Sequence, residues 1–106
     1  MAEEKKKREF TNKVYVGDKP FMNYVTSVTM MFTTSNFREV EIVARGRFIS
    51  KAVDIVLVSR DKFLEGIKTE ISDIKVSSEE FESSDGKQVR VSAISITMEK
   101  VWEERK

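Results

Sequence analysis

The stretch ARGRFISKAVD, residues 44–54, lies where an expected strand gives way to an expected helix. Residues 38–44 alternate apolar and polar side chains, as in a half-buried strand, and apolar residues then recur at helical spacing. The helix would open on Arg45, Gly46 and Arg47, although the free N–H groups and positive dipole end of a helix disfavour cations there. Two interpretations fit this junction. The arginines could bind a phosphate group, or they could be solvated while Gly46 acts as a neutral cap.

The phosphate interpretation is supported by a second basic junction earlier in the chain. Lys51 lies one turn beyond Arg47 on the same helix face, and we expect the two guanidinium groups to converge with the free backbone N–H groups. The first helix opens similarly, because Lys19 precedes its start and Asn23 and Tyr24 fall in its first turn. Both junctions follow parallel strands, so we expect one continuous phosphate-binding surface.

The order of elements predicts an α+β fold with two layers. Apolar spacing and turn residues give the order β-α-β-α-β-β, and right-handed crossovers place both helices on one face of a mixed four-stranded sheet. The other face would be partly open or would serve in assembly. We expect strands at about 14–16, 38–44, 67–81 and 88–100, a helix from Pro20 through an apolar stripe to Phe32, and a helix from about Arg47 to Leu64 that Gly66 terminates.

The last two strands are expected to form a protruding C-terminal hairpin. Asp85-Gly86 is a strong signal for a tight turn in which both central residues adopt positive φ. Residues 77–90 hold few large apolar side chains, so the tip cannot be buried. The apolar side chains of the last strand change parity along its length, which predicts a bulge or a twist near Ala93.

Length and composition bound the function classes. The 106 residues suffice for one domain, expected at 13–100 between a flexible charged tail at 1–12 and a short tail at 101–106. The chain has no cysteine and no histidine, which excludes thiolate or imidazole metal sites and histidine catalysis. We expect no cofactor and no metal. No apolar run approaches the roughly 20 residues of a membrane span, and no secretory signal is expected.

Charge is distributed unevenly along the chain. The net charge is +1, but residues 1–62 hold 12 Lys/Arg and 8 Asp/Glu, whereas residues 63–106 hold 7 and 10. The positive excess therefore lies in the half that contains the arginine pair. The lack of cysteine fits a reducing cytosol.

Four segments of the chain read GDKPFMNYV, ARGRFISKAVD, SRDKFL and SSDGKQVRVSAISI, and together they span about residues 13–100. In sequence, order and spacing they resemble the Alba family, small archaeal chromatin and RNA-binding proteins. The resemblance implies the β-α-β-α-β-β fold, which is similar to the C-terminal domain of a bacterial translation initiation factor. It also implies a dimer that binds double-stranded DNA and RNA without marked sequence preference, and dimers that associate further along DNA.

Spacing and resemblance together assign candidate residues for each of these contacts. Phe63 corresponds to an aromatic residue of dimer–dimer contacts in the family. For the dimer itself we expect an interface from the second helix and the last strands, with Leu57, Phe63, Ile94 and Ile96 as candidates. The candidate nucleic-acid-binding residues are Lys19, Asn23, Tyr24, Arg45, Arg47, Lys51, Lys87 and Arg90.

Two departures from the family pattern lower the expected affinity for DNA. Asp18 stands where many members carry the first of two lysines, a position linked to acetylation, and a carboxylate there repels phosphate. The hairpin has a net charge of −2, which suits an A-tract groove of high negative potential poorly. We therefore expect weaker or more RNA-directed binding than in typical members. The charged hairpin residues are Glu79, Glu80, Glu82, Asp85, Lys87 and Arg90.

The leading hypothesis is sequence-nonspecific binding of double-stranded DNA and RNA through phosphate contacts. The protein would act as a homodimer, or as a heterodimer with a paralogue, and would contribute to chromosome compaction in the cytoplasm of an archaeal cell, with no membrane partner. The alternative is an RNA-binding subunit or chaperone of a ribonucleoprotein assembly in which protein–protein contacts dominate. An enzyme is the least supported class, because the carboxylates form no recognisable catalytic pair.

Overall fold

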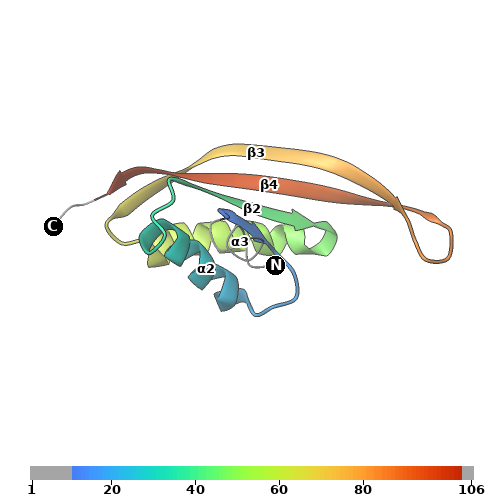
Figure 1. Ribbon diagram of the computed structural model, residues 1–106, viewed down its shortest axis with the longest axis horizontal. Coiled ribbons are helices and arrows are strands. Elements are labelled where there is room, and N and C mark those ends of the chain that lie inside the picture. The colour runs from blue at the N-terminus through green and yellow to red at the C-terminus, as the bar shows by residue number, and fades with distance from the viewer. Residues whose placement is uncertain (1–10, 104–106) are drawn as a thin grey trace, which may run out of the picture.

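The computed structural model describes residues 11–103 and contains the predicted order of elements. Both helices lie on one face of a four-stranded sheet, and the last two strands extend beyond the rest of the molecule (Figure 1). The predicted α+β fold is thereby confirmed. The elements are β1 (Lys13–Tyr15), α2 (Phe21–Thr33), β2 (Glu39–Arg45), a 3₁₀ turn (Gly46–Phe48), α3 (Ile49–Val58), a π turn (Ser59–Phe63), β3 (Ile67–Glu82) and β4 (Gln88–Glu103).

The sheet has the strand order β1-β2-β4-β3. β1 and β2 are parallel neighbours joined through α2, whereas β4 pairs antiparallel with both β2 and β3. Because β1 and β2 run in the same direction, the loop that follows β1 and the turn that follows β2 leave the sheet at the same end. This topology brings the two basic junctions together.

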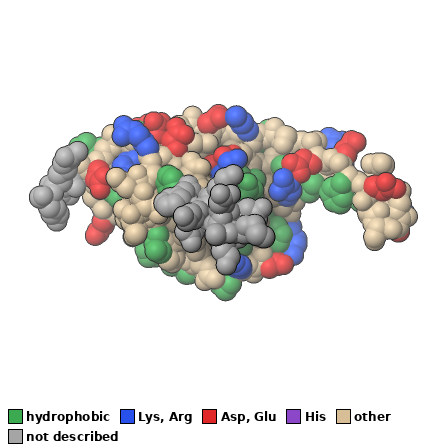
Figure 2. All heavy atoms as spheres, in the orientation of Figure 1, with side chains coloured by type: hydrophobic (Ala, Val, Ile, Leu, Met, Phe, Trp, Pro, Cys, Tyr) green, Lys and Arg blue, Asp and Glu red, His purple; other side chains and the backbone are tan. Residues whose placement is uncertain are grey.

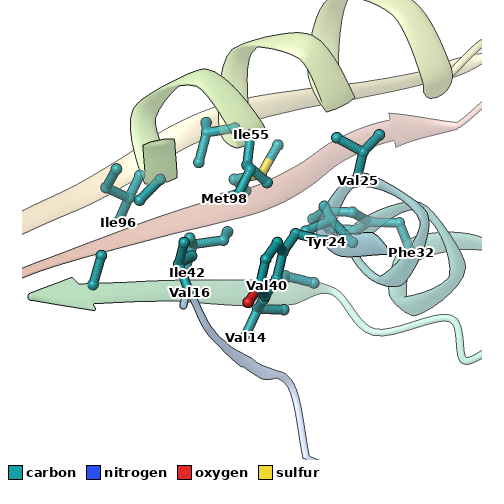
Figure 3. Close-up of a cluster of buried hydrophobic side chains, with 14 of the residues drawn as sticks. Val14, Val16, Tyr24, Val25, Phe32, Val40, Ile42, Ile55, Ile96 and Met98 are labelled. Carbon is teal, nitrogen blue, oxygen red and sulfur yellow. The ribbon is translucent and has the colours of Figure 1, made fainter. Parts of the chain in front are cut away.

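The core lies between the two helices and the helix-side face of the sheet (Figure 3). The Met and aromatic stripe of α2 is core packing, as expected, since Phe32 and its neighbours at helical spacing are buried. β2 contributes one parity of its side chains to the core and presents the other parity on the open face. The buried apolar cluster consists of Val14, Val16, Tyr24, Val25, Val28, Phe32, Val40, Ile42, Ala44, Ala52, Ile55, Val56, Leu64, Ile96 and Met98.

Both helices begin differently from the sequence expectation. Pro20 has φ −57° and ψ 146°, so it precedes α2 as its cap rather than forming its first turn. The second helix, predicted as one segment from Arg47 to Leu64, consists of a 3₁₀ turn, α3 and a π turn. No side chain caps its start, and the tighter 3₁₀ turn pairs the N–H of Ile49 with the carbonyl of Gly46 instead.

The bulge predicted near Ala93 is wrong. Ala93 lies opposite Ser77 in regular register, and the register shifts fall between Lys68 and Thr69 and between Ile71 and Asp73. The change in parity has a simpler cause. Between Ala93 and Glu99, β4 pairs with β2 beneath the helices, and its apolar side chains face the core there. Beyond Ala93 the hairpin extends past the helices, and the apolar side chains of β4 lie on the open face of the sheet instead.

The protruding part of the hairpin, residues 78–92, is called the arm below. It begins where β2 ends, because Arg45 is the last β2 residue paired with β4 and lies opposite Ala93. Asp85 does not adopt the positive φ predicted for it; among the central pair only Gly86 does, at +87°. The N–H of Gly86 bonds the carbonyl of Ser83 at 3.0 Å, which makes a longer loop than the predicted two-residue turn.

The last strand extends into the C-terminal tail that is predicted from the sequence. β4 ends at Glu103, beyond the end predicted at Lys100, so the strand includes Trp102. Most of the expected N-terminal tail, residues 1–10, and residues 104–106 lie outside the described residues. Within residues 11–103, neither helix has the length and apolar character needed to cross a membrane.

Candidate nucleic-acid interface

The loop between β1 and α2 is held by side chains from both helices. The hydroxyl oxygen of Tyr24 accepts hydrogen bonds from the N–H groups of Gly17 at 2.8 Å and Lys19 at 3.2 Å. The Nζ atom of Lys51 donates to the carbonyl oxygens of the same two residues, each at 2.7 Å. It also lies 5.0 Å from the centre of the Tyr24 ring. The backbone that carries Lys19 is therefore fixed in place by these two side chains.

Tyr24 and Lys51 are predicted to bind nucleic acid, but in the structure their polar atoms form hydrogen bonds within the protein itself. Tyr24 is only 7% exposed, and Lys51 is half-buried. Their contacts hold the loop that carries Lys19 in position. Hydrogen bonds from side chains to a loop's backbone depend on tertiary structure, so residue spacing alone does not reveal them.

Replacing Lys51 with methionine tests this support. We expect Lys51→Met to lower the free energy of unfolding by about 1–2 kcal/mol, because two carbonyl groups lose a charged donor. Urea unfolding measures this change. Lys62→Met, at an exposed position, is the control and should change the free energy by less than about 0.5 kcal/mol. Equal stability of the two variants would mean that the loop holds its position without Lys51.

Three of the predicted residues share one surface hollow. Lys19, Asn23 and Tyr24 line a hollow of about 410 Å³, together with Lys13 and Ser27. Sequence reasoning missed Lys13, because it considered the junction after β1 and not the residue that opens the strand. The ammonium group of Lys19 and the amide of Asn23 are donors suited to phosphate oxygens. The Nζ atom of Lys13 lies 3.7 Å from Oε1 of Glu41, so this ammonium group is paired within the protein.

Arg47 joins the second junction to the first. Its guanidinium donates to Oδ1 of Asp18 at 3.2 Å and lies 4.3 Å from the centre of the Phe48 ring. The side chains of Arg47 and Asp18 are 76% and 82% exposed. A single, highly exposed ion pair of this kind contributes at most about 1 kcal/mol, so Arg47 remains available to another anion.

Arg45 does not join this surface, and the expected convergence of the two guanidinium groups is wrong. Arg45 is the last residue of β2 and shares the open face with Val43, whereas Gly46, at φ +57°, turns the chain so that Arg47 lies on the side of the helices. A Cβ atom at Gly46 would lie 3.2 Å from Cγ2 of Val91. Backbone conformation and space thus both favour glycine between the arginines.

On the open face, Arg45 forms a two-point ion pair with Glu79. Its Nε lies 2.6 Å from Oε1 and its Nη2 lies 3.2 Å from Oε2 of the carboxylate. This hydrogen bonding raises the pKa of Arg45 and lowers the pKa of Glu79, and the opposite charges add to both shifts. Sequence reasoning counted Glu79 only among the acidic residues of the hairpin. The signal for this contact was its parity, which places Glu79 on the face of Arg45 once the register is known.

The remaining predicted residues lie elsewhere. Lys87 is exposed in the loop at the tip of the arm, and Nε of Arg90 donates to Oγ of Ser78 at 3.3 Å. The arm projects away from the two junctions, and in the face shown in Figure 2 acidic side chains reach its tip. Phe63 is 45% exposed in the π turn, at the opposite end of the molecule from the arm.

The comparisons with known proteins agree with this architecture. The sequence model of the Alba family matches residues 12–78. DNA/RNA-binding protein Alba 1 of Archaeoglobus fulgidus is 46% identical over 89 residues, which cover 84% of this chain and 96% of that protein. DNA/RNA-binding protein Alba of Methanothrix thermoacetophila is 47% identical over 87 residues, which cover 82% and 93%.

A solved structure adds the likeness in three dimensions. Alba from Thermoplasma volcanium superposes with a TM-score of 0.75 at 38% identity, and the match covers 83% of this chain and 99% of that one. The two helices, the mixed sheet and the hairpin thus occur together with the matching sequence segments over most of the chain. This protein belongs to the Alba family.

Proposed function

We propose that this protein binds double-stranded DNA and RNA through their phosphates, without sequence preference, and contributes to the architecture of the chromosome. The observation that carries the proposal is the meeting of two cationic junctions at one end of parallel strands. Lys19 stands on a loop clamped by two helices, and Arg47 reaches across to that loop. Relatives named as DNA/RNA-binding proteins support the same assignment. We place the protein in the cytoplasm, associated with the chromosome.

Dimerisation is part of the proposal, and an uncovered apolar surface supports it. The helices pack on β1, β2 and β4, so β3 presents apolar side chains on the helix side without cover. Val76 is 75% exposed and Ile74 is 56% exposed, and each lies opposite an isoleucine of β4. Uncovered apolar side chains in one row are typical of an interface between subunits. The exposed or half-buried apolar side chains of α3 and of the hairpin on this side are called the apolar row below. They are Val53, Leu57, Ile74, Val76 and Ile94.

The expected interface residues fit this surface unequally. Leu57 and Ile94 are half-buried and belong to the apolar row. Ile96 is only 3% exposed and belongs to the protomer's own core, so its assignment to the interface was wrong. Phe63 lies outside the row in the π turn, where its exposed ring is available for contacts between dimers, as proposed from the family.

The pKa shifts of two carboxyl groups favour a function other than catalysis. The pKa of Glu79 is lowered, first by its hydrogen bond from Arg45, and the pKa of Asp85 is lowered, first by the Ser83 hydroxyl. General-acid catalysis at neutral pH calls for a carboxyl group with a raised pKa. We therefore propose that the protein binds and does not catalyse.

The arm favours a second candidate function, a subunit of a ribonucleoprotein assembly. Phe81 is 51% exposed among acidic neighbours on the arm, and this combination suits a basic protein surface better than a phosphate backbone. Capture of partners before and after nuclease treatment separates the two functions. Partners that persist without nucleic acid, and that Phe81→Ser removes, would support the assembly subunit.

A titration of three ligands tests the leading proposal. Duplex DNA, duplex RNA and single strands of matched length are titrated at a series of salt concentrations. About six phosphate contacts per dimer predict a slope of roughly −5 in a plot of log affinity against log salt. An affinity that does not change with salt, or that is confined to one sequence, would contradict the proposal.

A further inference from the structure

The ion pair between Arg45 and Glu79 bridges the base of the arm. Arg45 ends β2, and beyond it β3 and β4 continue without support from β2. Glu79 lies in β3, two residues closer to the tip than Ser77, which occupies the same row as Arg45 and Ala93. The guanidinium therefore crosses β4 diagonally, over about 10 Å of sheet, because neighbouring strands lie about 4.8 Å apart.

A carboxylate and a phosphate present the same pair of oxygen atoms to a guanidinium group. The planar fork of arginine matches both anions, and one fork cannot bind both at once. Arg45 donates two hydrogen bonds to Glu79, whereas Arg47 donates one to Asp18. The side chains of Arg45 and Glu79 are also less exposed, at 50% and 43%. Of the two arginines, Arg45 is thus the one already occupied.

We propose that Glu79 limits the affinity for nucleic acid, because it competes with phosphate for Arg45 and thereby removes this arginine from the nucleic-acid contacts. The inference rests on the proposed function and refines it. In the paired state Arg45 anchors the base of the arm to β2, and the nucleic acid is bound by Lys19, Arg47 and their surroundings. Opening the pair would free one cation, but it would also leave the Glu79 carboxylate unpaired close to the phosphates, which disfavours the exchange.

The first test is Glu79→Gln, which leaves an amide of the same shape and removes the competing charge. Affinity for a short DNA duplex should rise about 5-fold at low salt, and the salt slope should steepen by about 1.8 per dimer, because each protomer gains one phosphate contact. Glu80→Gln is the matched control. It makes the same change in charge at the next residue, which lies on the other face of the sheet, opposite Arg90. Within residues 11–103, Glu80 forms no ion pair. The control should change affinity by less than about 2-fold and leave the slope as it is.

The second test introduces Arg45→Ala both into the wild-type protein and into the Glu79→Gln variant. In the wild-type protein the loss of Arg45 should leave the salt slope as it is, because Glu79 already holds Arg45 and no phosphate contact disappears, although the uncovered Glu79 carboxylate lowers the affinity. In Glu79→Gln the same replacement should reduce the magnitude of the slope by about 1.8 per dimer and restore the original value. An equal change in slope in both backgrounds would overturn the proposal, as would equal gains in affinity from Glu79→Gln and Glu80→Gln. Thermal unfolding confirms that each variant is folded. A wild-type affinity without salt dependence would instead contradict the proposed function itself.

Discussion

Replacing Lys19 and Arg47 together with alanine should lower the affinity for duplex DNA about 100-fold at low salt, because a dimer would lose four phosphate contacts. The salt slope should decrease in magnitude by about 3.6, since each contact contributes about 0.9. Both side chains are exposed, and neither belongs to the core, so the variant should remain folded. Fluorescence anisotropy at a series of salt concentrations measures both quantities.

The control for this variant carries the same loss of charge at the other end of the molecule. Lys62 and Lys68 are exposed in and after the π turn, far from the two junctions along the sheet. Their joint replacement with alanine should change affinity by less than about 3-fold, which is the effect of net charge alone. If the two double variants weaken binding equally, the junctions are not the interface, and the positive charge of the protein acts only as a whole.

Val76→Asp should convert the proposed dimer into a monomer. A carboxylate at this position would be buried without a partner in the proposed interface, and we expect the dissociation constant of the dimer to rise at least about 100-fold. The salt slope should then fall to about half, near −2.7, because a monomer offers about three phosphate contacts instead of six. Analytical ultracentrifugation and the salt titration provide the two measurements.

Ser77→Asp is a close control for Val76→Asp. It introduces the same charge at the next residue, which is exposed on the opposite face of the sheet. The dimer should persist in this variant. Loss of the dimer in both variants would show that charge on β3, and not the apolar row, governs association. A dimer that survives Val76→Asp would require an interface elsewhere.

The fold was predictable because apolar periodicity and turn residues determine it locally. The stripe of α2 and the alternation of β2 each identify the side that faces the core, and parallel strands with right-handed crossovers leave one arrangement of the helices. The predicted bulge near Ala93 failed for a related reason. Parity along a strand reports which face is apolar, and it does not report where the neighbouring elements end.

The site was predicted less completely, because its arrangement depends on residues at element boundaries. The predicted second strand ends at Ala44, which assigns Arg45 to the junction. In the structure β2 includes Arg45, and this one further strand residue lies on the open face. The positive φ of Gly46 then separates Arg45 from Arg47. Contacts such as those of Lys51 with loop carbonyls join residues that are 32 and 34 positions apart, and no local pattern encodes them.

The position of β3 at the side of the sheet has a consequence for solubility. A 16-residue edge strand presents a row of unsatisfied backbone groups that could template the addition of further strands, as in fibrils. Ser72 is the extra residue at a register shift, and Lys75 places a cation on the strand beside the apolar Ile74. Irregular register and charge are the features by which edge strands resist such growth. In the proposed dimer, association would then use the faces of the sheet rather than its edge, and a finite complex would form instead of an open-ended one.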